Sequence, residues 1–330
     1  MKKCNNLRGK TVILTGASRG IGAVISHLLV KEGANLIGIS RNEAKLKDWR
    51  KDLAQANPQR ELQVRYIAFD LSQTDALDKL LPQIKQILEA WESPNVDVLI
   101  NNAGVEIYRA FSDYSLREVE AVLRINLLSV MQLTHLLLPL LSPQGHIINM
   151  SSLAGKKSHP YDSVYAASKA GLLMWSHSLR QEMREGEQAV SAICPGYVVD
   201  TGMLADMDEK APLLAGRSRA HSVAKAVINT IRHRRAEVIV NQTPMLEATT
   251  RLMLALEQLF PVLNSLSNRL LGITASNKRK AYAASHQRLT QITTQTATPT
   301  VHQTHNCLPS AHHSVTHQAE SSACSPYSSF

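Results

Sequence analysis

The amino-acid sequence predicts an α/β protein in which about seven parallel strands form a doubly wound sheet with helices on both faces. Two observations support this fold class. Short runs rich in β-branched residues alternate with longer stretches whose apolar residues recur every three or four positions. Hydrophobic residues make up 44% of the 330 residues and aromatic residues only 5%, a composition that suits a sheet covered by helices.

The apolar runs give the order of the strands and helices along the chain. Strand, helix and strand repeated in this way imply a parallel sheet with helices on both faces. The predicted strands cover residues 11–15, 35–40, 63–69, 96–100, 145–150, 189–193 and 237–240. The predicted helices that connect them include 21–32, 74–90, 116–141 and 164–184.

A leucine-rich segment follows the last predicted strand. Its leucines lie on one helical stripe, which is expected to pack on its own domain or on a second subunit, with a membrane surface as the alternative. Pro261 interrupts the stripe, and the basic residues Lys278, Arg279 and Lys280 follow it. The members of the stripe are Leu252, Leu256, Leu259, Leu263, Leu266 and Leu270.

The sequence therefore divides into three parts. We expect an α/β domain over residues 1–244, an amphipathic helical extension over 245–284 and a tail over 285–330. The tail is rich in Ser, Thr, Gln, His and Ala and has few large apolar residues, so it cannot bury enough surface to become ordered. Its histidines are interpreted as polar residues of a disordered segment, and no metal site is expected.

Charge and cysteine usage narrow the function classes. The formal net charge is +9, but no basic block is interleaved with aromatic residues, so we expect no nucleic-acid partner. The four cysteines show neither the CxxC spacing of a zinc site nor a disulfide framework. The N-terminus lacks the apolar core of a secretory signal, and no uninterrupted apolar run reaches transmembrane length. We expect a cytoplasmic protein, with peripheral membrane association as the alternative.

A glycine-rich turn directly follows the first predicted strand. Its sequence is Thr15-Gly16-Ala17-Ser18-Arg19-Gly20-Ile21-Gly22, and it leads into the first predicted helix. Glycines let the backbone turn tightly and approach a pyrophosphate, whose charge then meets the amides at the start of the helix. A purely structural tight turn is the alternative for this motif taken alone.

Further motifs accompany the glycine-rich turn. They are Asp70 after the third strand, Asn101-Asn102-Ala103-Gly104 after the fourth, Asn126 in the next helix, Ser152 after the fifth strand, Tyr165-x-x-x-Lys169, and Pro195-Gly196 after the sixth. Together with the spacing Gly16-x-x-x-Gly20-x-Gly22, their order resembles the short-chain dehydrogenase/reductase family, in its compact single-domain branch, over roughly residues 8–240. The resemblance implies a Rossmann-type fold and an oxidoreductase that interconverts a carbonyl and an alcohol with a nicotinamide cofactor.

The end of the second predicted strand bears on the choice of cofactor. A carboxylate there would bond a ribose 2′-hydroxyl and repel a 2′-phosphate, whereas this chain has Ser40 and Arg41. Arg41, and Arg19 in the glycine-rich turn, stand where family members that prefer NADP(H) hold the phosphate, and guanidinium suits phosphate geometry. We therefore expect NADP(H), with two ordinary surface arginines as the alternative.

The resemblance assigns the rest of the cofactor site. It implies that Asp70 bonds the adenine amino group, although Asp70 could instead only cap the helical segment after it, and that Asn101 and Gly104 line the adenosine. The turn from Pro195 would close over the nicotinamide, and Thr201 would bond its carboxamide. The expected cofactor residues are Gly16, Ser18, Arg19, Gly20, Ile21, Gly22, Arg41, Asp70, Leu71, Asn102, Ala103, Gly104, Tyr165, Lys169, Pro195, Gly196, Val198 and Thr201.

The expected catalytic residues are Asn126, Ser152, Tyr165 and Lys169. Tyr165 and Lys169 are four positions apart in a predicted helix, so their side chains share one face. A neighbouring ammonium lowers the pKa of a phenol by about 1–3 units, which would let Tyr165 act as general acid or base. The resemblance implies that Ser152 holds the substrate oxygen, that Lys169 also bonds the nicotinamide ribose, and that Asn126 holds a water linked to solvent.

The substrate is expected to be a hydrophobic carbonyl or alcohol. A lid is predicted over 202–219, and its apolar side would close on a greasy substrate or only pack onto the body of the domain. Val105, Leu153 and Tyr161 are further candidates for the pocket wall. The apolar lid residues are Met203, Leu204, Met207, Leu213 and Leu214. The long extension resembles that of family members that act on lipophilic substrates at membranes.

Two other classes of function remain open at this point. One is a regulatory protein that binds NADP(H) without catalysis, and the other is a peripheral membrane protein that binds lipid through residues 245–280. The expected assembly is a homo-oligomer, a dimer or a tetramer.

Overall fold

The computed structural model describes residues 7–58, 63–183, 187–203, 212 and 216–283. The expected disordered tail, with its histidines, lies outside these residues. So do Leu204, Met207, Leu213 and Leu214 of the expected lid. The described residues all fall within one compact unit.

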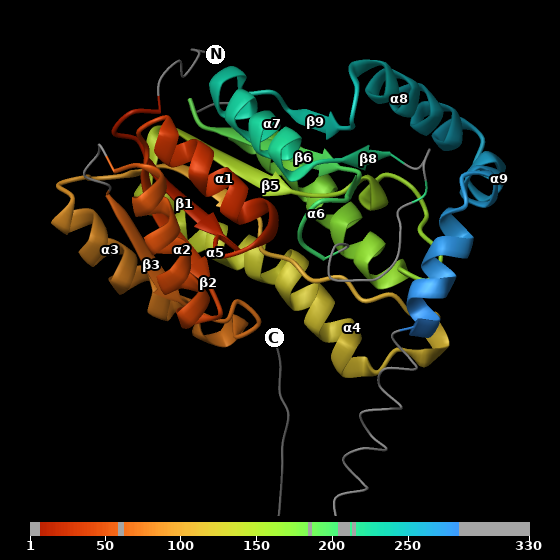
Figure 1. The fold of residues 1–330 in the computed structure, drawn as a ribbon, viewed down its shortest axis with the longest axis horizontal. Coiled ribbons are helices and arrows are strands. Elements are labelled where there is room, and N and C mark those ends of the chain that lie inside the picture. Colours follow the sequence, from red (N-terminus) through yellow and green to blue (C-terminus); the bar gives the residue numbers. More distant parts are fainter. Residues whose placement is uncertain (1–6, 59–62, 184–186, 204–211, 213–215, 284–330) are drawn as a thin grey trace, which may run out of the picture. The chain divides into compact units, whose positions relative to one another are not determined.

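Seven parallel strands form one sheet in the order β3-β2-β1-β4-β5-β6-β9 (Figure 1). The strands are β1 (Thr11–Thr15), β2 (Asn35–Ser40), β3 (Val64–Ala68), β4 (Val96–Asn101), β5 (Leu141–Met150), β6 (Ala189–Pro195) and β9 (Glu237–Val240). The strand order reverses between β1 and β4, which pair directly through Val12 and Val98. A ligand crevice forms outside the carboxyl ends of strands at such a reversal. The doubly wound parallel sheet predicted from the sequence is confirmed.

Helices cover both faces of this sheet (Figure 1). They are α1 (Gly20–Lys31), α2 (Glu43–Ala56), α3 (Leu80–Ala90), α5 (Ser129–Leu137), α6 (Ser163–Glu182) and α7 (Ala220–His233). On one face, α1, α2 and α7 bury residues such as Ile25, Trp49 and Val227 against the sheet. On the other, α3 and α5 bury Ile84 and Leu133. Burying these apolar stripes is what holds the helices to the sheet.

Two of the predicted helices are interrupted. The segment predicted over 116–141 consists of α4 (Leu116–Leu123), one π-helical turn (Arg124–Leu128), α5 and a short 3₁₀ turn. A 3₁₀ turn (Thr74–Lys79) likewise precedes α3. Apolar periodicity does not reveal such breaks, because the side chains on both sides still face the same core. Single π turns are frequent at functional sites, and this one carries Asn126.

Among the described residues, one helical stretch, Leu116–Leu140, is long and apolar enough to cross a membrane by length and composition. The sequence analysis had found no run of that length. In the structure, Leu133 and Leu137 of this stretch pack into the core beneath the sheet. Core packing thus accounts for part of its apolar character, since 39% of the stretch is buried.

The extension after β9 is helical, as predicted. It forms α8 (Pro244–Leu259), α9 (Val262–Leu270) and a further helical segment over 273–283, which we call the last helix. Leu254 anchors α8 on the domain, since it is buried beside Leu153 and Ile239. The last helix packs against the end of the sheet that carries the cavity described below.

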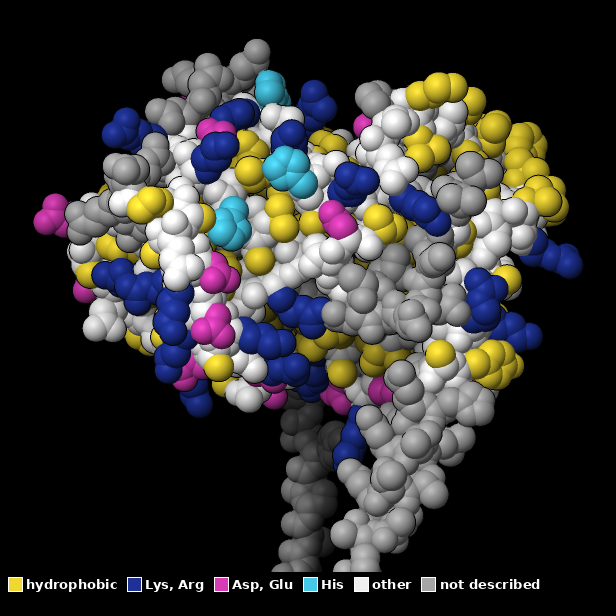
Figure 2. Space-filling model, viewed as in Figure 1, with side chains coloured by type: hydrophobic (Ala, Val, Ile, Leu, Met, Phe, Trp, Pro, Cys, Tyr) yellow, Lys and Arg dark blue, Asp and Glu magenta, His cyan; other side chains and the backbone are white. Residues whose placement is uncertain are grey.

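Most of the leucine stripe is not covered by the domain. The exposed fractions of Leu252, Leu259 and Leu270 are 63%, 73% and 77%, and Phe260 and Val262 beside them are also exposed. Figure 2 shows hydrophobic side chains gathered over α8 and α9. Packing on the chain's own domain, one of the expectations for the stripe, therefore does not account for it. We call this surface the leucine face.

Candidate active site

A cavity of about 520 Å³ lies at the carboxyl ends of the central strands. Its walls come from the segments that follow β1, β2, β3, β4, β5 and β6, so it occupies the crevice where the strand order reverses. Of the residues expected to bind the cofactor or take part in catalysis, all but Gly22, Asn101 and Asn126 line it.

The glycine-rich turn has a conformation that requires glycine. Gly16 and Gly20 have φ angles of 66° and 58°, in the left-handed region. A Cβ on Gly22 would lie 2.0 Å from the carbonyl oxygen of Gly16, so the first turn of α1 could not pack against the loop. The N-cap residue Arg19 makes no side-chain hydrogen bond to that turn, which leaves its amides to a ligand. The loop fits the pyrophosphate of a dinucleotide.

Basic side chains collect at the end of the cavity beside β2. Arg19, Arg41 and Lys45 all line this end, together with Ser40. The Arg41 side chain is 78% exposed, and its Nη1 lies 4.0 Å from Oδ2 of Asp70. Lys45, in the first turn of α2, was missed by the sequence analysis because no family motif marks it. Three cations in one place fit a phosphate beyond the pyrophosphate.

Asp70 makes hydrogen bonds to the segment just after it, which is the capping role given above as the alternative to adenine binding. Its Oδ1 accepts hydrogen bonds from the Ser72 amide at 3.0 Å and the Ser72 hydroxyl at 2.8 Å. Its side chain also lines the cavity with Leu71. One carboxylate can serve both purposes, because its two oxygens have several acceptor positions.

The two asparagines after β4 have different surroundings. Asn102 lines the cavity, and its amide donates to the carbonyl oxygens of Thr15 and Gly16 at 3.0 and 3.3 Å. Asn101 is buried, and its amide donates to Asn149 Oδ1 at 2.9 Å. Asn101 therefore does not line the cavity as expected, because neighbouring side chains of an extended segment point in opposite directions.

Ser152, Tyr165 and Lys169 lie together in the middle of the cavity. Tyr165 and Lys169 are both buried on α6, with Lys169 Nζ 5.6 Å from the centroid of the Tyr165 ring. Lys169 Nζ donates to the carbonyl oxygen of Met150 at 2.9 Å, and Ser152 is hydrogen-bonded to Tyr165. Ser151 instead donates to the backbone oxygen of Lys169 at 2.9 Å.

Burial dominates the electrostatics of this group. The pKa of Tyr165 is raised well above 10, because the phenol is buried and faces the carboxyls of Glu106 and Asp162, while the hydrogen bond with Ser152 acts the other way. Burial also lowers the pKa of Lys169 to about 8, against the opposing effect of Glu106. The expected lowering of the Tyr165 pKa is thus not met by the protein alone, since burial and the two carboxyls outweigh the lowering effect of Ser152. A positive charge bound beside the phenol would act in the lowering direction.

Asn126 does not line the cavity but hydrogen-bonds to Val105, which does. Its Oδ1 accepts from the Val105 amide and its Nδ2 donates to the Val105 carbonyl, both at 2.8 Å, and Nδ2 also donates to Ser168 Oγ at 3.0 Å. A Cβ on Gly104 would lie 3.1 Å from Asn126 Oδ1 and 3.4 Å from Lys169 Nζ. Asn126 therefore ties the segment after β4 to α6, close to Lys169.

The turn after β6 closes the far end of the cavity. Pro195, Gly196, Val198 and Thr201 all line it, as expected for residues near a nicotinamide. A Cβ on Gly196 would lie 2.1 Å from the carbonyl oxygen of Gly216, so this approach requires glycine. The contact is part of a two-stranded parallel ladder, β7 (Tyr197–Val198) with β8 (Arg217–Ser218), whose strands are too short for a sequence pattern to predict.

The cavity wall beyond Tyr165 is partly apolar and partly polar. Val105, Leu153 and Met203 line it, as anticipated, whereas Tyr161 does not, because it belongs to the positive-φ turn before α6. Polar residues also line this part of the cavity, and the sequence analysis assigned no substrate role to them. They are Glu106, Lys157, His159 and Tyr197.

Known proteins of one family are similar to this chain. The family model described as short chain dehydrogenase matches residues 10–212. A ketoacyl reductase, HetN, from Nostoc sp. is 43% identical over 277 residues, which are 83% of this chain and 93% of that protein. The dehydrogenase/reductase SDR family member 7B of Rattus norvegicus is 34% identical over 58% of this chain, and the match spans 59% of the rat protein.

Two solved structures share the fold. A metagenomic short-chain oxidoreductase in complex with NADP has a TM-score of 0.60 and 30% identity, covering 72% of this chain and 99% of that one. A short-chain dehydrogenase/reductase from Burkholderia phymatum in complex with NAD has a TM-score of 0.64 and 25% identity, covering 77% of this chain and 96% of that one.

Proposed function

Because this chain belongs to the short-chain dehydrogenase/reductase family of oxidoreductases, we propose that it is an NADP(H)-dependent enzyme that interconverts a carbonyl and an alcohol, with Tyr165 as general acid and base. One observation carries the proposal. The hydrogen-bonded pair Ser152 and Tyr165, with Lys169 beside them, lies in the same cavity as a glycine-rich turn that fits a pyrophosphate.

The residues at the β2 end support NADP(H) over NAD(H). Arg19, Arg41 and Lys45 would hold the 2′-phosphate, and no carboxylate stands at the end of β2, where one would bond the free ribose hydroxyl. Asp70 and Leu71 would line the adenine pocket, and the amides of the glycine-rich turn would bind the pyrophosphate. The related structures include one with NADP and one with NAD, so preference must be measured on this protein.

The chemistry of the chain's own residues follows from their positions. In reduction, the cofactor supplies the hydride to the carbonyl carbon. Tyr165 gives its phenolic proton to the carbonyl oxygen, which Ser152 holds by a hydrogen bond. Lys169 holds the ribose and keeps positive charge beside the phenol, and Asn126 fixes the segment through Gly104 against Lys169. In oxidation, Tyr165 takes the proton from the alcohol instead.

We propose a lipophilic carbonyl substrate. The apolar wall formed by Val105, Leu153 and Met203 supports it, and so does the similarity to a protein named as a ketoacyl reductase. A regulatory protein without catalysis would have no use for a hydrogen-bonded serine and tyrosine beside a buried lysine, which makes the enzyme the better supported proposal.

A panel of carbonyl compounds assayed with NADPH and with NADH side by side tests this function. The panel contains short, aromatic, steroidal and acyl ketones. We expect oxidation of NADPH with at least one of them and a clear preference for NADPH over NADH. Tight NADPH binding without turnover of any compound would indicate the regulatory alternative, and a preference for NADH would overturn the roles of Arg19 and Arg41.

We further propose that the leucine face lies on the surface of an anionic membrane. Its exposed apolar side chains include Leu252, Leu259 and Leu270, and the exposed basic residues Arg269 and Lys278 belong to the same extension. Apolar residues bordered by cations are typical of segments that lie in a lipid headgroup region. The proposed location is the cytoplasm, with the enzyme peripherally attached and the extension over 245–284 as its attachment. The homo-oligomer stays a prediction, which sedimentation analysis tests.

A further inference from the structure

The last helix carries an unusual set of buried polar residues. Asn277 and Lys280 are 0% and 3% exposed, whereas Lys278 between them is exposed. The apolar residues Ile273 and Ala281 are buried on the same segment. A buried lysine and a buried asparagine are costly unless each has partners, so their contacts identify what they do.

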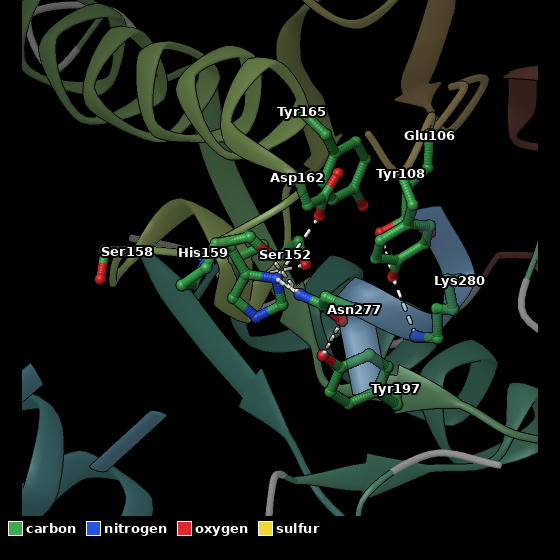
Figure 3. Close-up of polar contacts among 12 residues, drawn as sticks. Glu106, Tyr108, Ser152, Ser158, His159, Asp162, Tyr165, Tyr197, Asn277 and Lys280 are labelled. Atoms are coloured by element: carbon green, nitrogen blue, oxygen red, sulfur yellow. Dashed lines mark hydrogen bonds and ion pairs between the residues drawn. The ribbon is translucent and has the colours of Figure 1, made fainter. Parts of the chain in front are cut away.

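Asn277 holds two residues of the cavity wall. Its amide nitrogen lies 3.3 Å from Nδ1 of His159 and donates to the carbonyl oxygen of Pro160 at 3.1 Å. Its amide oxygen accepts from the hydroxyl of Tyr197 at 3.3 Å. Figure 3 shows the contacts of Asn277 with His159 and with Tyr197. One side chain of the last helix thus joins the loop before α6 to the turn after β6.

Lys280 contacts two tyrosine rings near the cavity wall. Its Nζ lies 4.3 Å from the centroid of the Tyr108 ring and 4.7 Å from that of Tyr197, within the range of cation–π attraction. The ammonium also lies 3.3 Å from the Tyr108 hydroxyl, which donates to Oε1 of Glu106 at 2.9 Å. Lys280 therefore holds Tyr197 directly and Glu106 through Tyr108 (Figure 3).

The protonation of this group suits hydrogen bonding to a ligand. Burial lowers the pKa of His159 to about 3, with Lys157 and Lys280 acting in the same direction, so the imidazole is neutral. A neutral imidazole has one donor and one acceptor nitrogen, and its Nδ1 lies 3.3 Å from the Asn277 amide nitrogen and 3.4 Å from Oδ2 of Asp162. Burial raises the pKa of Asp162, and the neighbouring Glu106 raises it further.

Glu106, His159 and Tyr197 line the cavity, and we call them the substrate wall. They lie around the same space as Ser152 and Tyr165 (Figure 3), where a substrate chain would extend. A plain hydrocarbon would add no hydrogen bond to this polar wall, whereas an oxygen on the chain could use the acceptor and donor positions that its internal hydrogen bonds leave over.

We propose that Asn277 and Lys280 are positioning residues of the substrate site, and that the substrate wall they hold recognises a second oxygen on the carbonyl substrate. The inference rests on the proposed function and deepens it. The substrate class becomes a lipophilic carbonyl compound with a further carbonyl or hydroxyl group near the reacting one, rather than a plain ketone. The extension over 245–284 then determines the substrate specificity of the enzyme as well as its attachment to the membrane.

The experiment compares two ketones of equal chain length, ethyl 3-oxobutanoate and 2-heptanone, with the full-length protein and NADPH. The variants are Asn277→Ala and Lys280→Met, with Lys278→Met as the matched control on the same helix and Lys280→Arg as the conservative variant. We expect the wild type to favour the oxo ester in kcat/KM. In Asn277→Ala and Lys280→Met the preference falls by about tenfold, mainly through KM, as expected for lost hydrogen bonds. The Kd of NADPH is unchanged in all variants.

Lys278→Met keeps the wild-type preference, and Lys280→Arg retains most of it because guanidinium also binds aromatic faces. A purely structural role would lower kcat for both ketones equally, together with the thermal unfolding midpoint, and would overturn the proposal. So would a wild type that does not distinguish the two ketones.

Hydrogen exchange measured by mass spectrometry separates this inference from the proposed function. Amides over 105–108 and 157–161 should exchange faster in Asn277→Ala and Lys280→Met than in Lys278→Met, whether or not any carbonyl is reduced. If the wild type turned over no carbonyl while these amides still responded, the proposed function would fail and the positioning role would stand. Unchanged exchange would remove the positioning role itself.

Discussion

The ammonium of Lys169 lies 5.6 Å from the centre of the Tyr165 ring and donates a hydrogen bond to the carbonyl oxygen of Met150 at 2.9 Å. Lys169 thus approaches the aromatic ring of Tyr165 within the range of cation–π attraction. Ser152 makes the direct hydrogen bond to Tyr165. The predictions about catalysis follow from this division of roles.

Replacing Tyr165 by Phe should abolish most turnover while leaving the cofactor site intact. The loss of a general acid lowers kcat by about 10²–10⁴-fold. The Kd of NADPH, measured by fluorescence titration, should change little, because the ring remains. Tyr161→Phe, outside the cavity, serves as the control and should retain wild-type kcat. Substantial turnover by Tyr165→Phe would mean that another group supplies the proton.

The rate should depend on pH through Lys169. Burial lowers the pKa of Lys169 to about 8, so its ammonium is charged below that pH and neutral above it. The positive charge beside Tyr165 is therefore lost as the pH rises through 8. We expect kcat/KM for NADPH, which reports the free enzyme, to decline with a midpoint near pH 8.

The variant Lys169→Arg checks the source of that decline. Guanidinium stays protonated throughout the range, so the step near pH 8 should disappear even if the overall rate is lower. A wild-type profile that stays flat between pH 7 and 9.5 would refute the assignment, as would an unchanged step in Lys169→Arg.

Arg41→Asp should shift the cofactor preference from NADPH toward NADH. The carboxylate repels a 2′-phosphate and can bond a free ribose hydroxyl. The Kd of NADPH should rise by about tenfold or more, and that of NADH should fall. Lys51→Asp, an equal change of charge at an exposed position on α2, should leave both constants as they are. Equal effects of the two variants would show only a general effect of net charge.

Gly22→Ala should disrupt the dinucleotide site. The added Cβ would lie 2.0 Å from the carbonyl oxygen of Gly16, so the glycine-rich turn must move away from α1. We expect the Kd of NADPH to rise by at least about tenfold. At Gly9, with φ 74°, a Cβ meets nothing within 4 Å, so Gly9→Ala should cost about 1 kcal/mol of stability from backbone strain and leave the Kd unchanged.

The leucine face should bind anionic vesicles. A variant with Leu252→Ser, Leu259→Ser and Leu270→Ser should lose co-flotation with vesicles of phosphatidylcholine and phosphatidylserine, while keeping NADPH oxidation in solution. Leu116→Ser on α4, where the leucine is 87% exposed, is the control and should still float. If the wild type stays in the soluble fraction but sediments as a dimer that the triple variant breaks, the face is an interface between two copies.

The sequence was sufficient for the strands and for most residues that line the cavity, because each depends on local features. The alternation of β-branched and helical segments predicted the sheet, and the glycine spacing predicted a tight turn, in which Gly16 and Gly20 have positive φ angles. Lys45, Glu106 and His159 were missed because they reach the cavity only after the chain folds. No local pattern distinguishes such residues from ordinary polar ones.

Lys280 is the clearest example of a residue whose surroundings could not be predicted from the sequence. In the sequence it is one of three consecutive basic residues, which predicts a solvated or membrane-facing group. In the structure it is buried against two tyrosines, one of which is 172 positions earlier in the chain. The direction of the Tyr165 pKa shift was also missed, because it depends on burial and on two carboxyls that the fold brings near.

The position of the last helix has a consequence for the order in which the site forms during protein synthesis. The glycine-rich turn, Ser152, Tyr165 and Lys169 leave the ribosome well before residues 273–283, and domains generally begin to fold from the N-terminal side. The nascent chain can therefore assemble its dinucleotide half first and receive Asn277 and Lys280 only near the end. A chain stopped before residue 273 would carry every family motif and still lack the two side chains that brace its substrate half.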